Sequence, residues 1–278
     1  MNLPEIRTFL AIIETGHLNR AASQLNVTQS TVTARLNSLE EEMGQVLFHR
    51  KKSGAELTSA GFRFERYAQL MVDVWQQACR ETALPPDIRG TFNYGCHPDL
   101  WPEYGRPLYD YVQETGSDVA LSAWPGDQTD LDRWLGSGLV DAAICYNPTM
   151  NDGRTVFPLG SEQLVLVSRE PRPLMRWDPL YIYVDAGEEF RRHHASAYPD
   201  GDTPTRILGS ATWARDYLLE QGGSGYLPAR LIREDMESGR LTPVEGAPVF
   251  ERNCYLVTNN DALPGWPWFD GVLSAISA

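Results

Sequence analysis

The sequence has few lysines, no paired cysteines and no long hydrophobic runs. No stretch approaches the roughly 18 consecutive apolar residues that a membrane-spanning helix needs. The four cysteines lie far apart and form no CxxC pair, which argues against a zinc site and against a disulfide framework. The first residues lack the basic and apolar segments of a secretory signal. We therefore expect a cytoplasmic protein that does not enter a membrane.

Common catalytic motifs are missing as well, since the chain contains no HExxH, GxSxG, GxxxxGK or GxGxxG. His193 and His194 are adjacent, and adjacent side chains point in different directions, so one metal ion would rarely bind both. His97 and Asp99 could form an acid–base pair, but no nucleophile or oxyanion donor can be identified beside them. We expect no enzymatic activity, no metal and no cofactor.

The 278 residues, 42% of them hydrophobic, suffice for two domains with buried cores. The net charge of −13 is unevenly distributed: residues 1–84 hold nine basic and nine acidic side chains, whereas residues 85–278 hold 15 and 28. The only two lysines, Lys51 and Lys52, stand beside Arg50. Because salt screens charges beyond about 10 Å, the acidic remainder does not prevent the first segment from binding phosphates.

The first 45 residues predict three short helices. Apolar residues recur at helical spacing up to Gly16, which ends the first helix. A second helix over residues 18–25 carries Ala21 and Ala22, which are small enough for another helix to cross closely. After a tight turn, Thr28 is a good N-cap for a third helix.

The third helix has an outer side of short polar and amide side chains with almost no charge. Such a surface can enter the major groove of DNA, where Gln and Asn pair with adenine and Ser or Thr contact bases or phosphates. A merely solvated helix face is the alternative, but the preceding helix and tight turn favour DNA. The residues expected at DNA are Gln29, Ser30, Thr31, Thr33, Arg35 and Asn37.

Residues 46–58 carry two short apolar runs around a basic, glycine-containing turn, which predicts a β-hairpin. Arg50, Lys51 and Lys52 would bind the phosphate backbone there and fix the register without reading much sequence. A hairpin that is simply solvated is the alternative.

One ordered set of residues runs through these helices and the hairpin without a gap: Phe9-Leu10, Gly16, Ala21-Ala22, Leu25 to Thr33, Leu39-Glu40, Gly44, Leu47-Phe48, Arg50, Leu57-Thr58 and Ala60-Gly61. This set closely resembles the DNA-binding domain of LysR-type transcriptional regulators, and the resemblance implies a winged helix-turn-helix. Ala34 departs from it, because many members have an arginine or another polar residue there. Arg35 would take over a phosphate contact.

Residues 59–83 contain no proline and predict a long helix that Pro85-Pro86 ends. Its apolar seam consists of Phe64, Tyr67, Ala68, Met71, Val74, Trp75 and Ala78. The seam could pack on its own domain, but pairing with a second copy is more plausible for a helix of this length. In the family resembled, this helix pairs antiparallel with its partner, and tetramers are common. A symmetric homodimer predicts a pseudo-palindromic site on double-stranded DNA.

From residue 88 onward short apolar strands alternate with helices, which predicts an α/β domain with parallel sheets. The expected strands are Thr91–Gly95, Val119–Ala123, Ala142–Tyr146, Leu164–Val167, Leu180–Val184, Ile207–Leu208 and Tyr255–Val257. The expected helices are Trp101–Glu114, Thr129–Gly136, Thr212–Gln221 and Ala229–Ser238.

Two segments, Leu131 to Ile144 and Gly222 to Pro228, resemble parts of the sensor domain of LysR-type regulators. The fold implied is that of periplasmic binding proteins, with two lobes around a ligand cleft. The predicted organisation is a winged helix-turn-helix domain (1–59), a dimerisation helix (60–87) and an effector-binding domain (88–278). Lobe I would comprise about 88–160 and 246–278, and lobe II about 161–245.

Open α/β sheets bind ligands beyond the carboxyl ends of their strands. Family members often have Ser or Thr after the first strand, whereas this chain has Cys, His, Pro and Asp. Asp99 with two tryptophans would suit an aromatic or even cationic small-molecule effector, although each position could equally be ordinary loop or core. The residues expected at the effector are Cys96, His97, Asp99, Trp101, Trp124, Thr129, Tyr146, Asn147, Asp185, Ser210, Thr212 and Tyr226.

The sequence therefore predicts a DNA-binding transcription regulator whose promoter binding is modulated by a small-molecule effector. Two alternatives stay open. One is a redox-sensing regulator that uses two of the four thiols, Cys79, Cys96, Cys145 and Cys254. The other is an enzyme with a fused DNA-binding domain, which would show turnover.

Overall fold

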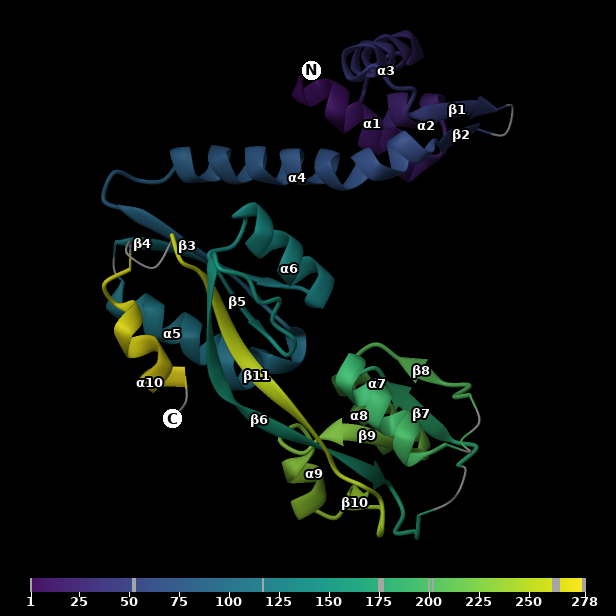
Figure 1. The fold of residues 1–278 in the computed structure, drawn as a ribbon, viewed down its shortest axis with the longest axis vertical. Coiled ribbons are helices and arrows are strands. Elements are labelled where there is room, and N and C mark those ends of the chain that lie inside the picture. Colours follow the sequence, from purple (N-terminus) through teal and green to yellow (C-terminus); the bar gives the residue numbers. More distant parts are fainter. Residues whose placement is uncertain are drawn as a thin grey trace. The chain divides into compact units, whose positions relative to one another are not determined.

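The chain folds into two compact units, residues 1–86 and 87–278. The computed structural model describes residues 2–51, 54–116, 118–174, 178–199, 201, 203–261 and 266–276, and of Arg50 the backbone only. None of the helices in these ranges is long and apolar enough to span a bilayer. The elements of the first unit are α1 (Leu3–Thr15), α2 (Leu18–Gln24), α3 (Gln29–Met43), β1 (Phe48–Lys51), β2 (Gly54–Leu57) and α4 (Ser59–Thr82) (Figure 1).

Local sequence signals set the ends of the first three helices. The Asn2 side chain accepts a hydrogen bond from the backbone N–H of Glu5, whose carboxylate accepts one from the Asn2 N–H, so α1 begins with a capping box. The turn between α2 and α3 passes through Asn26, whose φ of 54° is a left-handed conformation that asparagine tolerates. Thr28 then caps α3, its hydroxyl accepting from the N–H of Thr31 at 3.2 Å.

The core of the first unit joins the helices to the hairpin and to α4. The Phe9 ring of α1 packs against Phe48 of β1 and Phe64 of α4, with centroid distances of 5.3 and 5.1 Å. Ala68 and Val72 of α4 are buried in the same core. The first half of α4 is therefore part of this unit.

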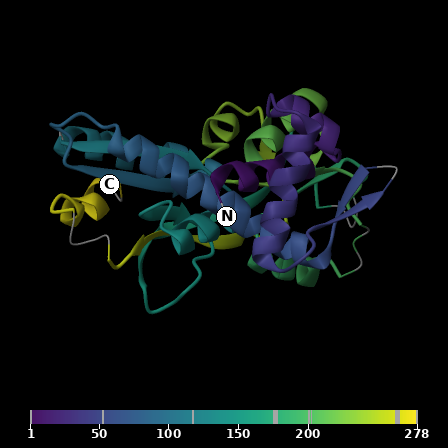
Figure 2. The same cartoon turned by 90° about the horizontal axis from the view of Figure 1, so that it is seen from above.

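The hairpin β1–β2 is anchored to the end of α1 by a close backbone approach. The N–H of Ala55 donates to the carbonyl of Gly16 at 2.8 Å. A Cβ on Gly54 would lie 2.5 Å from that same carbonyl oxygen, and its φ is 137°, so the position requires glycine. The hairpin projects away from the helices in both views (Figure 1 and Figure 2).

The second unit is built on one nine-stranded sheet, ordered β4-β3-β5-β11-β6-β9-β7-β8, with β10 pairing with β6. Its strands are β3 (Gly90–Cys96), β4 (Val119–Pro125), β5 (Ala142–Cys145), β6 (Arg154–Ser168), β7 (Tyr181–Val184), β8 (Ile207–Leu208), β9 (Ser224–Pro228), β10 (Thr242–Pro243) and β11 (Phe250–Asn259). Its helices are α5 (Arg106–Thr115), α6 (Gln128–Ser137), α7 (Glu188–Ala197), α8 (Ala211–Gln221), α9 (Arg233–Glu237) and α10 (Val272–Ile276).

Two long strands connect the ends of this unit. β6 and β11 pair antiparallel from Leu164–Phe250 to Arg154–Asn259 and run through its middle (Figure 1). We call the end with β3, β4, β5, α5, α6 and α10 lobe I, and the end with β7, β8, β9, α7 and α8 lobe II. The two lobes of an α/β fold, expected from the sequence, are thus present.

Alternate residues of each strand face opposite helical layers, as the pleat requires. In β5, Ala142 and Ile144 face the core beneath α5 and α10, whereas Ala143 and Cys145 face α6. Lobe II repeats this pattern: Tyr226 of β9 faces α7 and the following leucine faces α8. Both lobes are therefore three-layered, with helices on both faces of the sheet.

Several expected elements were wrong in length. β6 and β11 are far longer than the expected strands 164–167 and 255–257, because they are stabilised mainly by pairing with each other, which no local pattern encodes. Their antiparallel pairing also makes the sheet mixed rather than parallel.

Two expected helices are shorter than predicted, and two helices of the structure, α7 and α10, have no counterpart among the expected ones. Residues 101–105 form a single wide turn before α5, and only Arg233–Glu237 of the expected helix 229–238 is α-helical. Helix α7, which is rich in charge and poor in apolar residues, was not predicted.

Candidate DNA-binding and ligand-binding sites

The outer face of α3 carries the polar residues that the sequence singled out. Gln29, Ser30 and Asn37 are exposed, whereas Thr31, Thr33 and Arg35 are half-buried. The hydroxyls of Ser30 and Thr31 each lie 2.8 Å from the hydroxyl of Thr28, the N-cap. The cap therefore fixes the first-turn side chains before any DNA is bound.

Glu40 fixes the hairpin relative to α3. Its carboxylate accepts hydrogen bonds from the backbone N–H groups of Leu47 and Phe48, at 2.7 and 3.2 Å. On the other side of the helix, the Ser38 hydroxyl donates to Glu5 of α1 at 2.8 Å. α3 is thereby tied to both its neighbours.

One basic residue of the hairpin can be placed. Lys51 lies 2.5 Å from Glu56 across the hairpin, and both side chains are more than half exposed. An exposed pair of this kind is weak, so the ammonium group can exchange its carboxylate for a phosphate. Lys52 and the side chain of Arg50, the other expected phosphate contacts, lie outside the described part of the chain.

In the second unit, the ends of β3 and β5 bring four expected effector residues together. Cys96 ends β3, His97 and Asp99 follow it, and Tyr146 follows β5. The rings of His97 and Tyr146 meet edge to face at 4.9 Å, and the imidazole Nδ1 lies 4.0 Å from the Asp99 carboxylate. Cys96 and Tyr146 are buried.

Four charged residues that the sequence analysis did not single out complete this group. Arg252 of β11 lies over the Tyr146 ring, 3.5 Å from its centroid, and pairs with Glu162 of β6. Arg230, which follows β9, lies 2.5 Å from Glu162 and 3.5 Å from Glu103 of lobe I. The sequence contained no local signal for the first two, because each stands between two polar neighbours in its strand.

Arg230 connects the two lobes directly. It follows a strand of lobe II, and its guanidinium donates to the Tyr146 hydroxyl of lobe I at 3.1 Å while contacting Glu103. Asn147, at the end of β5, also faces lobe II, since a Cβ on Gly187 would lie 2.8 Å from its amide nitrogen. We call the set His97, Asp99, Glu103, Tyr146, Glu162, Arg230 and Arg252 the interlobe cluster.

Apart from Glu103, the interlobe cluster is largely buried, and it is charged. Burial lowers the pKa of His97, and the nearby Asp99 carboxylate opposes this only in part. One nitrogen of Arg252, Nη2, lies 3.7 Å from Asp99 and makes no hydrogen bond among the described residues. Because an unsatisfied buried donor is costly, this nitrogen is the natural place for an acceptor atom of a ligand.

The remaining expected effector residues occupy other positions in the two lobes. Trp101 and Trp124 are partly exposed, and Trp101 packs against Tyr109. Asp185 pairs with Arg191 at 2.6 Å, and the Ser210 hydroxyl caps α8. Thr129 and Thr212 are exposed on helices α6 and α8.

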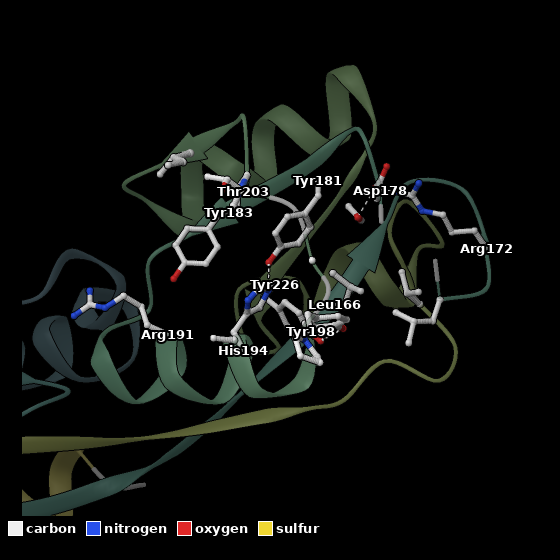
Figure 3. A pocket seen from close by; sticks show the side chains of 18 of the residues that line it. Leu166, Arg172, Asp178, Tyr181, Tyr183, Arg191, His194, Tyr198, Thr203 and Tyr226 are labelled. Atoms are coloured by element: carbon white, nitrogen blue, oxygen red, sulfur yellow. Dashed lines mark hydrogen bonds and ion pairs between the residues drawn. The ribbon is translucent and has the colours of Figure 1, made fainter. Parts of the chain in front are cut away.

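Tyr226 lines a different space, a cavity of about 470 Å³ between the lobe II sheet and α7 (Figure 3). The sequence analysis expected Tyr226 at one effector site with the residues that follow β3 and β5. Among the described residues, however, Tyr226 makes no contact with the interlobe cluster. The tyrosines of β7 and the α7 residues that form the other walls were not predicted.

Comparison with known families gives the assignment. Residues 3–62 match the family described as bacterial regulatory helix-turn-helix protein of the lysR family, and residues 87–265 match the LysR substrate binding domain. The chain belongs to the LysR family of transcriptional regulators. The resemblance noted in the sequence and the expected fold class are thereby confirmed.

Relatives within the LysR family extend over nearly the whole chain. The HTH-type transcriptional regulator HdfR of Salmonella schwarzengrund is 28% identical over 262 residues, 92% of each chain. ArgP of Mycobacterium tuberculosis is similar in structure, with a TM-score of 0.57, 22% identity and coverage of 99% of this chain and 97% of that one. DarR of Vibrio fischeri, solved in complex with DNA, has a TM-score of 0.58 at 18% identity, covering 100% and 98%. These identities support the fold and leave the ligand open.

Proposed function

We propose that this LysR-family regulator acts in the cytoplasm as a homodimer, or a tetramer built from dimers, on a pseudo-palindromic promoter site. A small-molecule effector bound between the lobes would change the affinity of the regulator for its promoter DNA. The observation that carries the proposal is the outer face of α3: exposed amide and hydroxyl groups, held by the Thr28 cap and flanked by a basic hairpin.

The outer face of α3 suits the major groove for a chemical reason. Amides such as Gln29 and Asn37 can form paired hydrogen bonds with adenine, and the hydroxyls of Ser30, Thr31 and Thr33 can contact bases or phosphates. Arg35 and the hairpin residues Arg50, Lys51 and Lys52 would contact phosphates and set the register.

Helix α4 supports a dimer. Beyond Val72 it has no buried residue, and Val74 and Trp75 are about half exposed. Phe62 and Tyr67 are exposed on the same helix. Burying such side chains against a second copy would stabilise a pair of α4 helices.

The interlobe cluster is the proposed effector site. Arg252 Nη2 would donate to an oxygen of the effector, and the ligand would compete with the links that Arg230 makes to Tyr146 and Glu103. The protein would then have two states, one with these Arg230 contacts formed and one with them broken. An effector that binds the two states with different affinity shifts the equilibrium between them, typically by about 1–3 kcal/mol.

The DNA-binding proposal is tested by fluorescence anisotropy with labelled DNA from upstream of the regulator's own gene. Gln29→Ala and Asn37→Ala should each weaken specific binding by about 1–3 kcal/mol while leaving binding to scrambled DNA unchanged. Lys51→Gln should weaken binding to both DNAs and lower the salt slope by about one.

Gln45→Ala is the matched control, because this exposed amide lies just beyond the end of α3. It should leave both affinities unchanged. Wild-type specificity in the Gln29 and Asn37 variants would remove the outer face of α3 from DNA recognition and defeat the proposal.

A further inference from the structure

Lobe II contains a cavity that shares no residue with the interlobe cluster. Its floor is the α7 side of the sheet, with Tyr181 and Tyr183 of β7 and Tyr226 of β9, and its wall is α7 (Figure 3). Residues 191, 194 and 195 of α7 line it together with Tyr198, the C-cap of this helix, and they share one helical face. About 470 Å³ lies within the range of small-molecule sites.

Four tyrosines and one histidine line the cavity. Tyr183 meets His194 edge to face at 5.6 Å, and Tyr181 stacks on His194 at 5.7 Å. At the mouth, Ile207 is 65% exposed and Leu174 38% exposed, although both are apolar. A flat apolar ligand would stack on such rings and cover this exposed apolar surface.

Two of the hydroxyls that line the cavity, those of Tyr198 and Tyr226, have their protons already committed. The Tyr226 hydroxyl donates to the carbonyl of Pro248 at 3.0 Å, because a carbonyl can only accept. Tyr198, 2.7 Å from the Tyr226 oxygen, must therefore donate to it. The Tyr198 oxygen keeps lone pairs, so the cavity offers a hydrogen-bond acceptor to a ligand's N–H or O–H.

Among the described residues that line the cavity, each arginine and aspartate has an ionic partner within the protein. Arg172 lies 2.7 Å from Asp178, and Arg191 lies 2.6 Å from Asp185. Burial lowers the pKa of His194, which favours its neutral form. The Arg172–Asp178 pair is largely buried, so a charged ligand deep in the cavity would have to break it or remain unpaired in an aromatic surrounding.

We infer that lobe II carries a ligand site of its own, which takes a neutral, flat aromatic molecule bearing an N–H or O–H group. The molecule would stack among Tyr181, Tyr183 and His194 and donate to the Tyr198 oxygen. This site is additional to the proposed effector site at the interlobe cluster, and its occupation does not depend on DNA binding.

A matched pair of fluorescent probes tests the inference on the full-length protein. N-phenyl-2-naphthylamine is neutral, flat and has one N–H, and its sulfonate derivative adds only a remote negative charge. The neutral probe should show saturable fluorescence enhancement and bind at least about tenfold more tightly than the sulfonate. Equal affinities, or no saturable binding of the neutral probe, would overturn the inference.

Variants on α7 locate the binding. Ala195 is exposed and lines the cavity, whereas Ala197 is exposed on the same helix and does not line it. Ala195→Trp should fill the mouth and weaken the neutral probe at least about tenfold, and Ala197→Trp should leave its affinity unchanged. Equal affinity in the two variants would place the probe elsewhere and refute the site.

Two further variants separate this site from the rest of the protein. Tyr198→Phe, which keeps the ring, should weaken the neutral probe several-fold by removing the acceptor. His97→Ala, in the interlobe cluster, should leave probe affinity unchanged. If His97→Ala abolished probe binding and Tyr198→Phe did not affect it, the ligand would belong to the interlobe site.

Discussion

Glu162 meets two guanidinium groups, those of Arg230 and Arg252, in the interlobe cluster. It is 6% exposed, so its charge is tolerated only because both partners are present. Arg230 reaches this carboxylate from the end of a lobe II strand and also contacts lobe I. The Glu162 carboxylate thus joins side chains from the two long strands, β6 and β11, and from both lobes.

We predict that Glu162→Gln destabilises the protein by about 3 kcal/mol, because it leaves two arginine charges without their shared partner in a buried place. Urea unfolding at neutral pH measures this. Glu103→Gln is the control: Glu103 is 44% exposed and 3.5 Å from Arg230, and its loss should cost less than about 1 kcal/mol. Equal losses in the two variants would show that Glu162 does not organise the cluster.

Helix α4 changes its surroundings along its length. Its first half packs Phe64, Ala68 and Val72 into the core of the first unit, whereas its second half has no core contact. The seam expected from the sequence as one dimer surface is therefore partly buried within its own unit. Tyr67, Val74 and Trp75 are exposed, and in the proposed dimer they would contact the second copy.

We predict that Trp75→Glu dissociates the proposed dimer, because it replaces a large apolar contact by a charge. Loss of a central aromatic residue typically costs at least about 2 kcal/mol, which raises the dissociation constant about thirtyfold or more. Light scattering coupled to size exclusion measures the mass. Gln77→Glu, two residues on and on the opposite side of the helix, should keep the wild-type mass; a dimeric Trp75→Glu variant would contradict the prediction.

The distribution of thiols over the whole molecule bears on the redox alternative. Cys96, Cys145 and Cys254 are buried in the second unit, and burial raises the pKa of each to about 12. At neutral pH they are protonated, and the thiol form is a poor nucleophile. Cys79, on α4, is the one exposed thiol. These surroundings disfavour a thiol switch.

We predict that micromolar hydrogen peroxide leaves promoter affinity within about twofold of the untreated protein, since protonated buried thiols react slowly. The same anisotropy assay measures it. Cys79→Ser serves as a control, because any response that it abolishes would come from the exposed thiol. A large response that survives in Cys79→Ser and disappears on substitution of Cys96 or Cys254 would revive the redox alternative.

The DNA-binding half could be predicted closely because its signals are local. Each signal acts on residues that are close to it in the sequence. These signals are the caps at Thr28 and Gly44, the small pair Ala21 and Ala22, and the apolar stripe of α3. The same residues place Gln29 and Asn37 on the outer face, so their exposure follows from the helix pattern. Their contact with bases remains a prediction.

The sensor half was predicted less completely because its site depends on distant pairings. The rule about strand ends selected His97, Asp99 and Tyr146, which the structure brings together, but Glu162 and Arg252 become neighbours only when β6 pairs with β11. No pattern near residue 230 indicates that Arg230 reaches Tyr146. The cavity in lobe II likewise joins α7 to strands that are far away in the sequence.

By itself, the sequence determined the family, the helix-turn-helix with its hairpin and the presence of an α/β sensor, because periodicity, caps and turn residues act over short range. Only the tertiary structure decided which charges meet between the lobes, which part of the α4 seam is buried within its own unit and where a cavity opens. Those features depend on burial and on pairing between remote segments. The free energy that stabilises them therefore comes from contacts in the folded protein, and no single segment of the sequence encodes it.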